Sequence, residues 1–411
     1  MNGFDEFSTE VSSLENGATL ATMNIPNCYT TTIEFFVKIG EKNESEDKLG
    51  ITHLTEHLWC GRFRNDKGQT LWETARGCGG RSNGETGLEH TACWITVPHQ
   101  STFDAIDSLA SIAIETNFSD DEVRKEAEVI VEELSEDLDN PTAIAANEMK
   151  KVWGDSPLSR SDFLAIDILP KLSKKHVLDY YKNNYSFSNM IIAVAGRVNH
   201  IEIVDKMSQV LLKEKQAYTK LNIESSSYRR INPPEIFMGD YASLLHIATK
   251  GISRYDDRYW ALECLALVLC SAELQTRLWK FLRDKGLSYG PEASACHYSD
   301  VGLFDVFVPF TDKSQYIEKE VIKQMIGMAK LNTEEIIWAK EQLKTNFLAS
   351  IPESENAAMY LAESAYYLGK VLKVPEVIEQ INAVNENSVE AIAKEIMRDE
   401  LISVVRVSPK V

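Results

Sequence analysis

The order of strand and helix patterns constrains the fold most, because a similar outline occurs twice along the 411 residues. In the first outline, β-branched and aromatic residues predict strands at 31–39 and 89–97, and a short apolar run predicts another at 190–195. Helical patterns fill the intervals, at 51–63, 103–116, 120–138, 143–152, 173–183 and 201–213.

A change of composition separates the two outlines. Residues 215–234 carry three consecutive serines, an Arg-Arg pair and a Pro-Pro pair, which is typical of a linker. Beyond it, strands are predicted at 243–249, 289–296, 302–310 and 401–407, and helices at 256–270, 272–282 and within 313–398. The helices come in runs, so we predict an α+β protein of two similar domains, at residues 1–220 and 221–411.

The charge excludes several classes of protein. With 62 acidic and 43 basic residues the net charge is −19, which argues against binding to nucleic acid or to an anionic membrane surface. No run of about 18 apolar residues occurs, so no membrane-spanning helix is expected. The acidity serves solubility or, alternatively, forms a cavity that attracts cationic substrates.

The amino terminus and the cysteines indicate the compartment. No Lys or Arg precedes Lys38, whereas Asp5, Glu6 and Glu10 do, so the start is unlike a secretory or mitochondrial targeting segment. The seven cysteines are scattered without a Cys-x-x-Cys pair, which is typical of core thiols in a reducing compartment. We therefore expect a cytoplasmic protein, with a trimmed precursor as the alternative.

One motif carries the chemistry: His53-Leu54-Thr55-Glu56-His57. On a helix, positions i and i+4 share a face, so the two histidines can hold one metal ion. Glu56 borders that face, where a carboxylate can take the proton of a metal-bound water whose pKa the metal lowers to about 7. The alternative is a helix whose histidines only satisfy hydrogen bonds in the core.

A third ligand is expected from the acidic helix at 120–138, since a catalytic zinc takes three protein ligands and leaves one position open. Two sets of glutamates each share a face of this helix: Glu122, Glu126 and Glu133, and Glu128, Glu132 and Glu136. Most such charges belong to a solvated face. The spacing alone does not decide which of them is the ligand.

The motif and its surroundings resemble a known family. The order His-x-x-Glu-His is the inverted zincin motif, and residues 50–58 resemble the pitrilysin/insulinase family of metallopeptidases, which includes the mitochondrial processing peptidases and their bacterial relatives. Further segments resemble that family in its order and span nearly the whole chain, at 79–86, 126–133, 189–196 and 274–289.

The resemblance implies a role for each matching residue. His53 and His57 match the zinc ligands, and Glu133 matches the third ligand on the acidic helix. Glu126 matches a carboxylate beside the ligands, and Glu56 matches the general base. Because the second half has no such motif, one Zn²⁺ is expected per chain.

The resemblance also implies the architecture and the way in which substrate binds. Each chain is expected to form two related units, each a mostly antiparallel sheet covered by helices, as half of a clamshell chamber. Asn83 matches a residue on the strand that faces extended substrate. The peptide is expected to add to this strand as a further strand of the sheet.

Arg283 and Tyr289 resemble the family's Arg and Tyr, which bind the substrate carbonyl and stabilise its oxyanion. Their spacing is one residue shorter than usual, so Arg277 is an alternative to Arg283. Gly84 stands where the family often has alanine, which we expect to be a mild change.

These features together predict a zinc metalloendopeptidase that hydrolyses short or unfolded peptides inside a closed chamber. The resemblance implies a homodimer or a heterodimer with a related chain. Two alternatives stay open: a maturation protease for one dedicated peptide, and a non-catalytic peptide-binding or scaffold subunit of a heterodimer.

Overall fold

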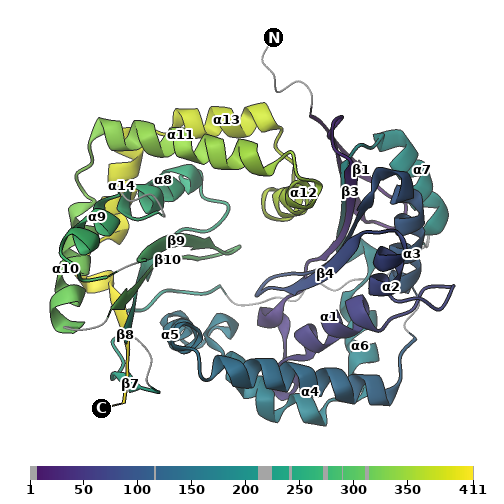
Figure 1. The fold of residues 1–411 in the computed structure, drawn as a ribbon, viewed down its shortest axis with the longest axis horizontal. Coiled ribbons are helices and arrows are strands. Elements are labelled where there is room, and N and C mark those ends of the chain that lie inside the picture. The colour runs from purple at the N-terminus through teal and green to yellow at the C-terminus, as the bar shows by residue number, and fades with distance from the viewer. Residues whose placement is uncertain are drawn as a thin grey trace. The chain divides into compact units, whose positions relative to one another are not determined.

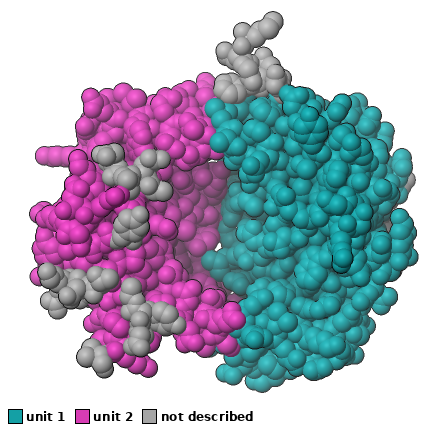
Figure 2. Space-filling view, in the orientation of Figure 1, with its two compact units in different colours: residues 1–133, 164–223, 347–376 teal, residues 134–163, 224–346, 377–411 magenta. Residues whose placement is uncertain are grey.

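The computed structural model describes residues 7–114, 117–211, 225–239, 243–271, 276–288, 290–310 and 314–410. The chain divides into two compact units (Figure 2). Unit 1 comprises residues 1–133, 164–223 and 347–376, and unit 2 comprises residues 134–163, 224–346 and 377–411.

The division does not follow the chain in two contiguous pieces. One change of unit, at residues 223 and 224, lies close to the domain boundary expected at 220. Segment 134–163 lies in the first half of the sequence but belongs to unit 2. Segment 347–376 lies in the second half but belongs to unit 1. Helical periodicity predicts that a helix has a buried face, but it does not tell which sheet covers that face.

Unit 1 is built on a six-stranded sheet in the order β1-β2-β6-β3-β5-β4 (Figure 1). The strands are β1 (Ser8–Ser13), β2 (Thr19–Asn24), β3 (Thr30–Val37), β4 (Arg81–Thr86), β5 (Thr91–Pro98) and β6 (Met190–Gly196). The β2–β6 pair is parallel and the other neighbours are antiparallel. The mostly antiparallel sheet is as expected, although the sequence patterns predict neither β1 nor β2, and β4 is indicated only by the family resemblance.

Helices cover both faces of this sheet. Helix α12 (Ser354–Leu368) packs on β2, β3 and β6, while α1 (Ile51–Gly61) and α3 (Thr102–Ile114) pack against β5. Phe36, Trp94 and Ile191 lie in the buried apolar cluster under α12. The remaining helices that lie wholly or mainly in unit 1 are α2 (Leu71–Gly77), α4 (Asp120–Asp137), α6 (Lys174–Asn184) and α7 (His200–Val210).

Unit 2 repeats this plan with a five-stranded sheet in the order β7-β11-β8-β10-β9. Its strands are β7 (Ile236–Phe237), β8 (Ser243–Lys250), β9 (Glu292–His297), β10 (Gly302–Phe310) and β11 (Ser403–Ser408), and only β7–β11 is a parallel pair among the described residues. Its helices are α5 (Pro141–Met149), α8 (Tyr259–Leu269), α9 (Arg277–Asp284), α10 (Ser314–Gly327), α11 (Thr333–Ser350), α13 (Val374–Ala383) and α14 (Glu386–Ile396). The α+β class is confirmed.

Buried polar contacts fix the two exchanged helices on their sheets. At the start of α12, the Ser354 hydroxyl lies 2.8 Å from Oγ1 of Thr30 and 3.0 Å from Oγ1 of Thr32. In unit 2, Nδ1 of His246 on β8 lies 3.2 Å from the carbonyl oxygen of Ala145 on α5. Such buried bonds are costly to break, so they hold each helix in one register. Across the residues that the structure describes, no helix is both long and apolar enough to cross a membrane.

Glu34 on β3 makes the stability of unit 1 depend on pH. Only 4% of its surface is exposed, and burial, followed by the charges of Glu363, Glu85 and Glu355, raises its pKa from 4.5 to about 8. Between these two pH values the folded state binds a proton that the unfolded state has lost. The free energy of unfolding therefore falls as the pH rises through this window.

We predict that Glu34→Gln stabilises the protein by roughly 3 kcal/mol at pH 7 and by much less at pH 5. Urea unfolding at both pH values measures the difference, with the exposed Glu10→Gln on β1 as a control for the loss of one carboxylate. A stabilisation of equal size at both pH values would contradict the assignment.

Candidate metal centre

Helix α1 carries the two histidines of the motif, and a glycine and a buried carboxylate fix its start. Gly50 precedes the helix with a φ of 84°, in the left-handed region that favours glycine. The Glu44 side chain accepts hydrogen bonds from the backbone N–H groups of Gly50 at 2.9 Å and of Thr52 at 2.7 Å. Glu44 thereby caps amide groups that the first helical turn leaves open, next to His53.

Three side chains converge beside this helix. Ligand atoms of His53, His57 and Glu133 lie within 4.8 Å of one another. The Oε2 atom of Glu133, on α4, lies 3.9 Å from Nε2 of His53 and 3.8 Å from Nε2 of His57. The imidazole rings stand edge to face, with centroids 4.7 Å apart. Both Nε2 atoms therefore approach the same carboxylate.

A second carboxylate orients His57. Its Nδ1–H donates to Oε2 of Glu126 at 3.1 Å, which leaves Nε2 with the lone pair that a metal needs. Burial lowers the pKa of His57, but the hydrogen bond to Glu126 and the charges of Glu56, Glu133 and Glu126 raise it by more. Burial and then the charge of His57 lower the pKa of His53 to about 4, so His53 is neutral at pH 7.

The glutamates of α4 have different partners. Glu122 accepts from the N–H and hydroxyl of Ser119, each at 2.8 Å, which closes the start of the helix, and it pairs with Arg64 at 2.9 Å. Glu126 bonds to His57, and Glu133 faces both histidines. The members of the other set are exposed: Glu128, Glu132 and Glu136.

Glu56 turns toward β4 rather than into solvent. Its residue surface is 7% exposed, and a Cβ added to Gly84 would lie 1.9 Å from Oε1 of Glu56 and 2.6 Å from Sγ of Cys60. The carboxylate thus fills the space of a side chain at position 84, so an alanine there is not the mild change expected from sequence. Burial raises the pKa of Glu56, and the charge of His57 and a hydrogen bond with Cys60 oppose this rise.

Asn83 lies on β4, but its side chain is on the other face of the sheet. Side chains alternate along a strand, and Gly84 is the residue that faces α1. On the face that Asn83 shares, Arg81 pairs with Glu355 of α12 at 2.9 Å. The backbone of Asn83 therefore belongs to the strand that faces Glu56, but its side chain points to the opposite face of the sheet.

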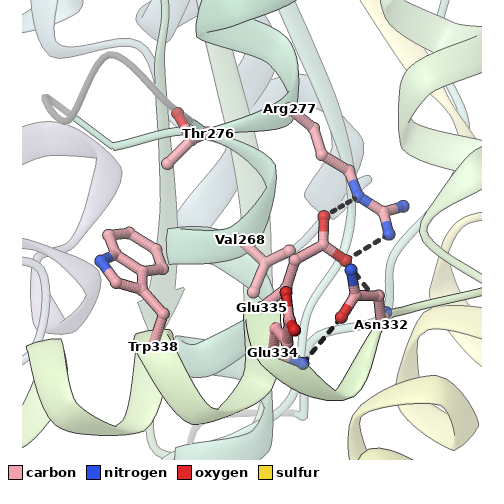
Figure 3. A pocket seen from close by; sticks show the side chains of 7 residues that line it. All are labelled: Val268, Thr276, Arg277, Asn332, Glu334, Glu335 and Trp338. Carbon is pink, nitrogen blue, oxygen red and sulfur yellow. Dashed lines mark hydrogen bonds and ion pairs between the residues drawn. The ribbon is translucent and has the colours of Figure 1, made fainter.

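The predicted oxyanion residues belong to unit 2. Arg283 is exposed on α9, with its guanidinium carbon 5.9 Å from the ring centroid of Trp279, and Tyr289 lies outside the described residues. The alternative, Arg277, is bound by Glu335 at 2.7 Å (Nε to Oε1) and 2.5 Å (Nη2 to Oε2), so its charge is already balanced (Figure 3). This pair borders a pocket whose other lining residues are Val268, Thr276, Asn332, Glu334 and Trp338.

Sequence reasoning missed Arg62, which directly follows α1. Its Nε donates to Oε1 of Glu126 at 2.6 Å, and its Nη2 forms an ion pair with the same oxygen at 2.6 Å. No motif marks this residue, because its role depends on a contact with a helix 64 positions away. Glu44 was missed as well, because it precedes Gly50 by six residues and so lies outside the positions where a sequence indicates a helix cap.

The donor set fits a zinc ion. Two imidazole nitrogens and one carboxylate oxygen are ligands that Zn²⁺ takes in catalytic sites, where a fourth position stays open. A ligating histidine usually donates its other ring N–H to a carboxylate, as His57 does to Glu126. The Glu133 side chain is 50% exposed, which leaves the cluster accessible from solvent.

The chain is similar to two family models and to several known proteins. Residues 19–162 match the family described as "Insulinase (Peptidase family M16)", and residues 171–343 match the "Peptidase M16 inactive domain". An uncharacterized zinc protease of Rickettsia felis is 27% identical over 385 residues, which cover 92% of each chain. A probable mitochondrial-processing peptidase subunit beta of Arabidopsis thaliana is 23% identical and covers 98% of this chain and 78% of its own.

A solved structure supports the fold. The crystal structure of a protease from Helicobacter pylori superposes with a TM-score of 0.87 at 17% identity, covering 98% of this chain and all of that one. The two family matches together span most of the chain, in the order that the sequence resemblance implied. This chain belongs to the insulinase family of peptidases, family M16.

Proposed function

We propose that this chain is a zinc-dependent endopeptidase that hydrolyses short or unfolded peptides. The observation that carries the proposal is the convergence of His53, His57 and Glu133, with ligand atoms within 4.8 Å, beside the buried carboxylate of Glu56. A scaffold protein needs no such set of groups. Relatives named as zinc proteases support the same function.

Each residue has a distinct task in the proposed reaction. His53, His57 and Glu133 hold the zinc ion, which when bound polarises the peptide carbonyl and lowers the pKa of the attacking water. Glu56 takes a proton from that water and later gives it to the leaving amine. Burial favours the neutral, protonated form of Glu56. The side chain can therefore hold the proton until it passes to the leaving amine.

The free edge of β4 supports an extended substrate. In the sheet of described strands, β4 is the last strand and pairs with β5 alone, so its outer edge is open to strand addition. Gly84 of β4 contacts Glu56, so a peptide on this edge would lie beside the general base. A segment must be extended to pair in this way, which favours unfolded peptides, and Asn83 is proposed to contact them.

The peptide is proposed to be hydrolysed inside a closed chamber, and the chain is proposed to act as a dimer. One relative is by its name a subunit of a processing peptidase, which supports a dimer with a second copy or with a related chain. Arg283 and Tyr289 are proposed to stabilise the substrate oxyanion, from the same chain or from the partner. Light scattering of the purified chain, with and without zinc, tests the dimer.

A digest tests the activity directly. We predict that the wild-type chain with zinc cleaves a mixed set of unstructured peptides, while Glu56→Gln binds zinc equally well and loses at least about 10³-fold in rate, since it lacks a proton acceptor. Mass spectrometry of the products measures the rate and maps the cleaved bonds.

The same digest separates the alternatives. Cleavage of one peptide among many would favour a dedicated maturation protease. Absence of cleavage by the wild type and by Glu56→Gln, with peptide binding retained, would favour a non-catalytic subunit. Equal cleavage by the wild type and Glu56→Gln would contradict the assignment of Glu56 as the base.

Position 84 gives a second prediction. In Gly84→Ala, the new methyl group collides with the Glu56 carboxylate, so we expect kcat to fall by about 10²-fold, as a misplacement of about 1 Å does. Zinc content is expected to stay the same, because the atoms nearest to the added methyl group belong to Glu56 and Cys60 and not to a proposed ligand.

The matched control is Ser82→Ala, two positions away on the same face of β4. It alters the strand without reaching Glu56, so its kcat should stay within about twofold of the wild type. Full kcat in Gly84→Ala would show that catalysis does not require the Glu56 carboxylate in its position beside β4.

A further inference from the structure

Two arginines in the short segment after α1 bind two glutamates one turn apart on α4. Arg62 donates through Nε to Oε1 of Glu126 at 2.6 Å, and its Nη2 forms an ion pair with the same oxygen at 2.6 Å. Arg64 donates to Glu122 at 2.9 Å. The two pairs are alike in charge and in the elements that they join, but only Glu126 touches a proposed metal ligand.

Arg62 is tied rigidly to the helix that carries the histidines. Its backbone N–H donates to the carbonyl of Leu58 at 2.8 Å and caps the last turn of α1. The Arg64 side chain donates to the Arg62 carbonyl at 3.1 Å. The guanidinium of Arg62 is therefore presented from a fixed backbone, five positions after His57.

The contacts form a chain from Arg62 to the metal centre. Glu126 is 5% exposed and its two oxygens are divided between two donors: Oε1 accepts from Arg62 and Oε2 accepts from Nδ1–H of His57. Removal of the guanidinium would leave Oε1 buried without that partner, and a carboxylate in this state turns toward the donors that remain. The hydrogen bond that orients the His57 ring would then lose its fixed acceptor.

We propose that Arg62 is a positioning residue that sets the affinity for zinc by holding Glu126 in the orientation that aims Nε2 of His57 at the metal. This inference rests on the proposed function. It adds a residue outside the ligand motif, and it assigns no such role to Arg64, whose partner Glu122 makes its other contacts with Ser119.

Zinc affinity of the full chain, measured without peptide by competition with a chromophoric chelator, tests the proposal. Arg62→Met keeps the length of the side chain and removes its donors, and we expect the affinity to fall by about 10-fold or more, as for other partners of ligating groups. Arg64→Met removes the same charge and also the hydrogen bond to the Arg62 carbonyl, but the Arg62 backbone N–H keeps its bond to Leu58, so the affinity should change by less than about twofold. Arg62→Lys should restore part of the loss, since it returns the charge but not the two-point contact.

A double-mutant cycle shows whether Arg62 acts through Glu126. In a Glu126→Gln chain, the Arg62→Met change should have little further effect on zinc affinity, because the link is already broken. Multiplicative losses would overturn the proposal, as would equal losses in Arg62→Met and Arg64→Met or no loss in Arg62→Met. If Arg62→Met does not fold, Arg62→Lys and its cycle with Glu126→Gln give the same comparison.

The outcomes distinguish this inference from the proposed function. A wild-type chain that binds no zinc would overturn both. A chain that binds zinc with equal affinity in the wild type and Arg62→Met would overturn the role of Arg62 alone. Loss of peptidase activity without a change in zinc affinity would likewise contradict a role in holding the metal.

Discussion

The proposed metal centre in unit 1 depends on the contact between α1 and α4, since neither helix alone carries all three proposed ligands. α1 supplies two imidazoles one turn apart, and α4 supplies Glu133, whose Oε2 lies within 4 Å of both Nε2 atoms. The same two helices meet again through His57 and Glu126. Glu126 and Glu133 lie on the same helix, so a shift of α4 would change both contacts at once.

The surrounding fold keeps that contact in place and brings a strand edge to it. The start of α1 is fixed by Glu44 and Gly50, and its last turn is capped by Arg62. Gly84 lets β4 approach the Glu56 carboxylate closely, because any larger side chain would occupy the same space. The outer edge of β4, the proposed general base Glu56 and the three proposed ligands therefore all lie in unit 1.

Local patterns in the sequence predicted the parts that depend on short spacing. The pair of histidines needs only a helix at 51–63, which apolar periodicity indicates, and the structure has α1 at Ile51–Gly61. For the third ligand, spacing left two sets of glutamates on α4 open, and the members of one set, Glu122, Glu126 and Glu133, have different partners in the structure. Spacing along one helix does not reveal which partner each will meet, so the family resemblance was needed to single out Glu133.

Long-range contacts explain what the sequence did not predict. The exchange of α5 and α12 between the units depends on buried contacts such as His246 with Ala145, which join distant parts of the chain. Arg62 likewise gains its role from a residue on another helix. β1 was missed for a different reason: it is polar and largely exposed, so it lacks the apolar alternation that marks a half-buried strand.

X-ray absorption at the zinc edge of the purified full chain would show directly which atoms bind the metal. We predict one zinc per chain with a shell of nitrogen and oxygen at about 2.0–2.2 Å, an imidazole signature for two histidines, and no sulfur. Cys60 and Cys93 lie close by, with sulfur atoms 2.6 Å apart. A sulfur shell at about 2.3 Å, or a chain that takes up no zinc, would contradict the assignment of His53, His57 and Glu133.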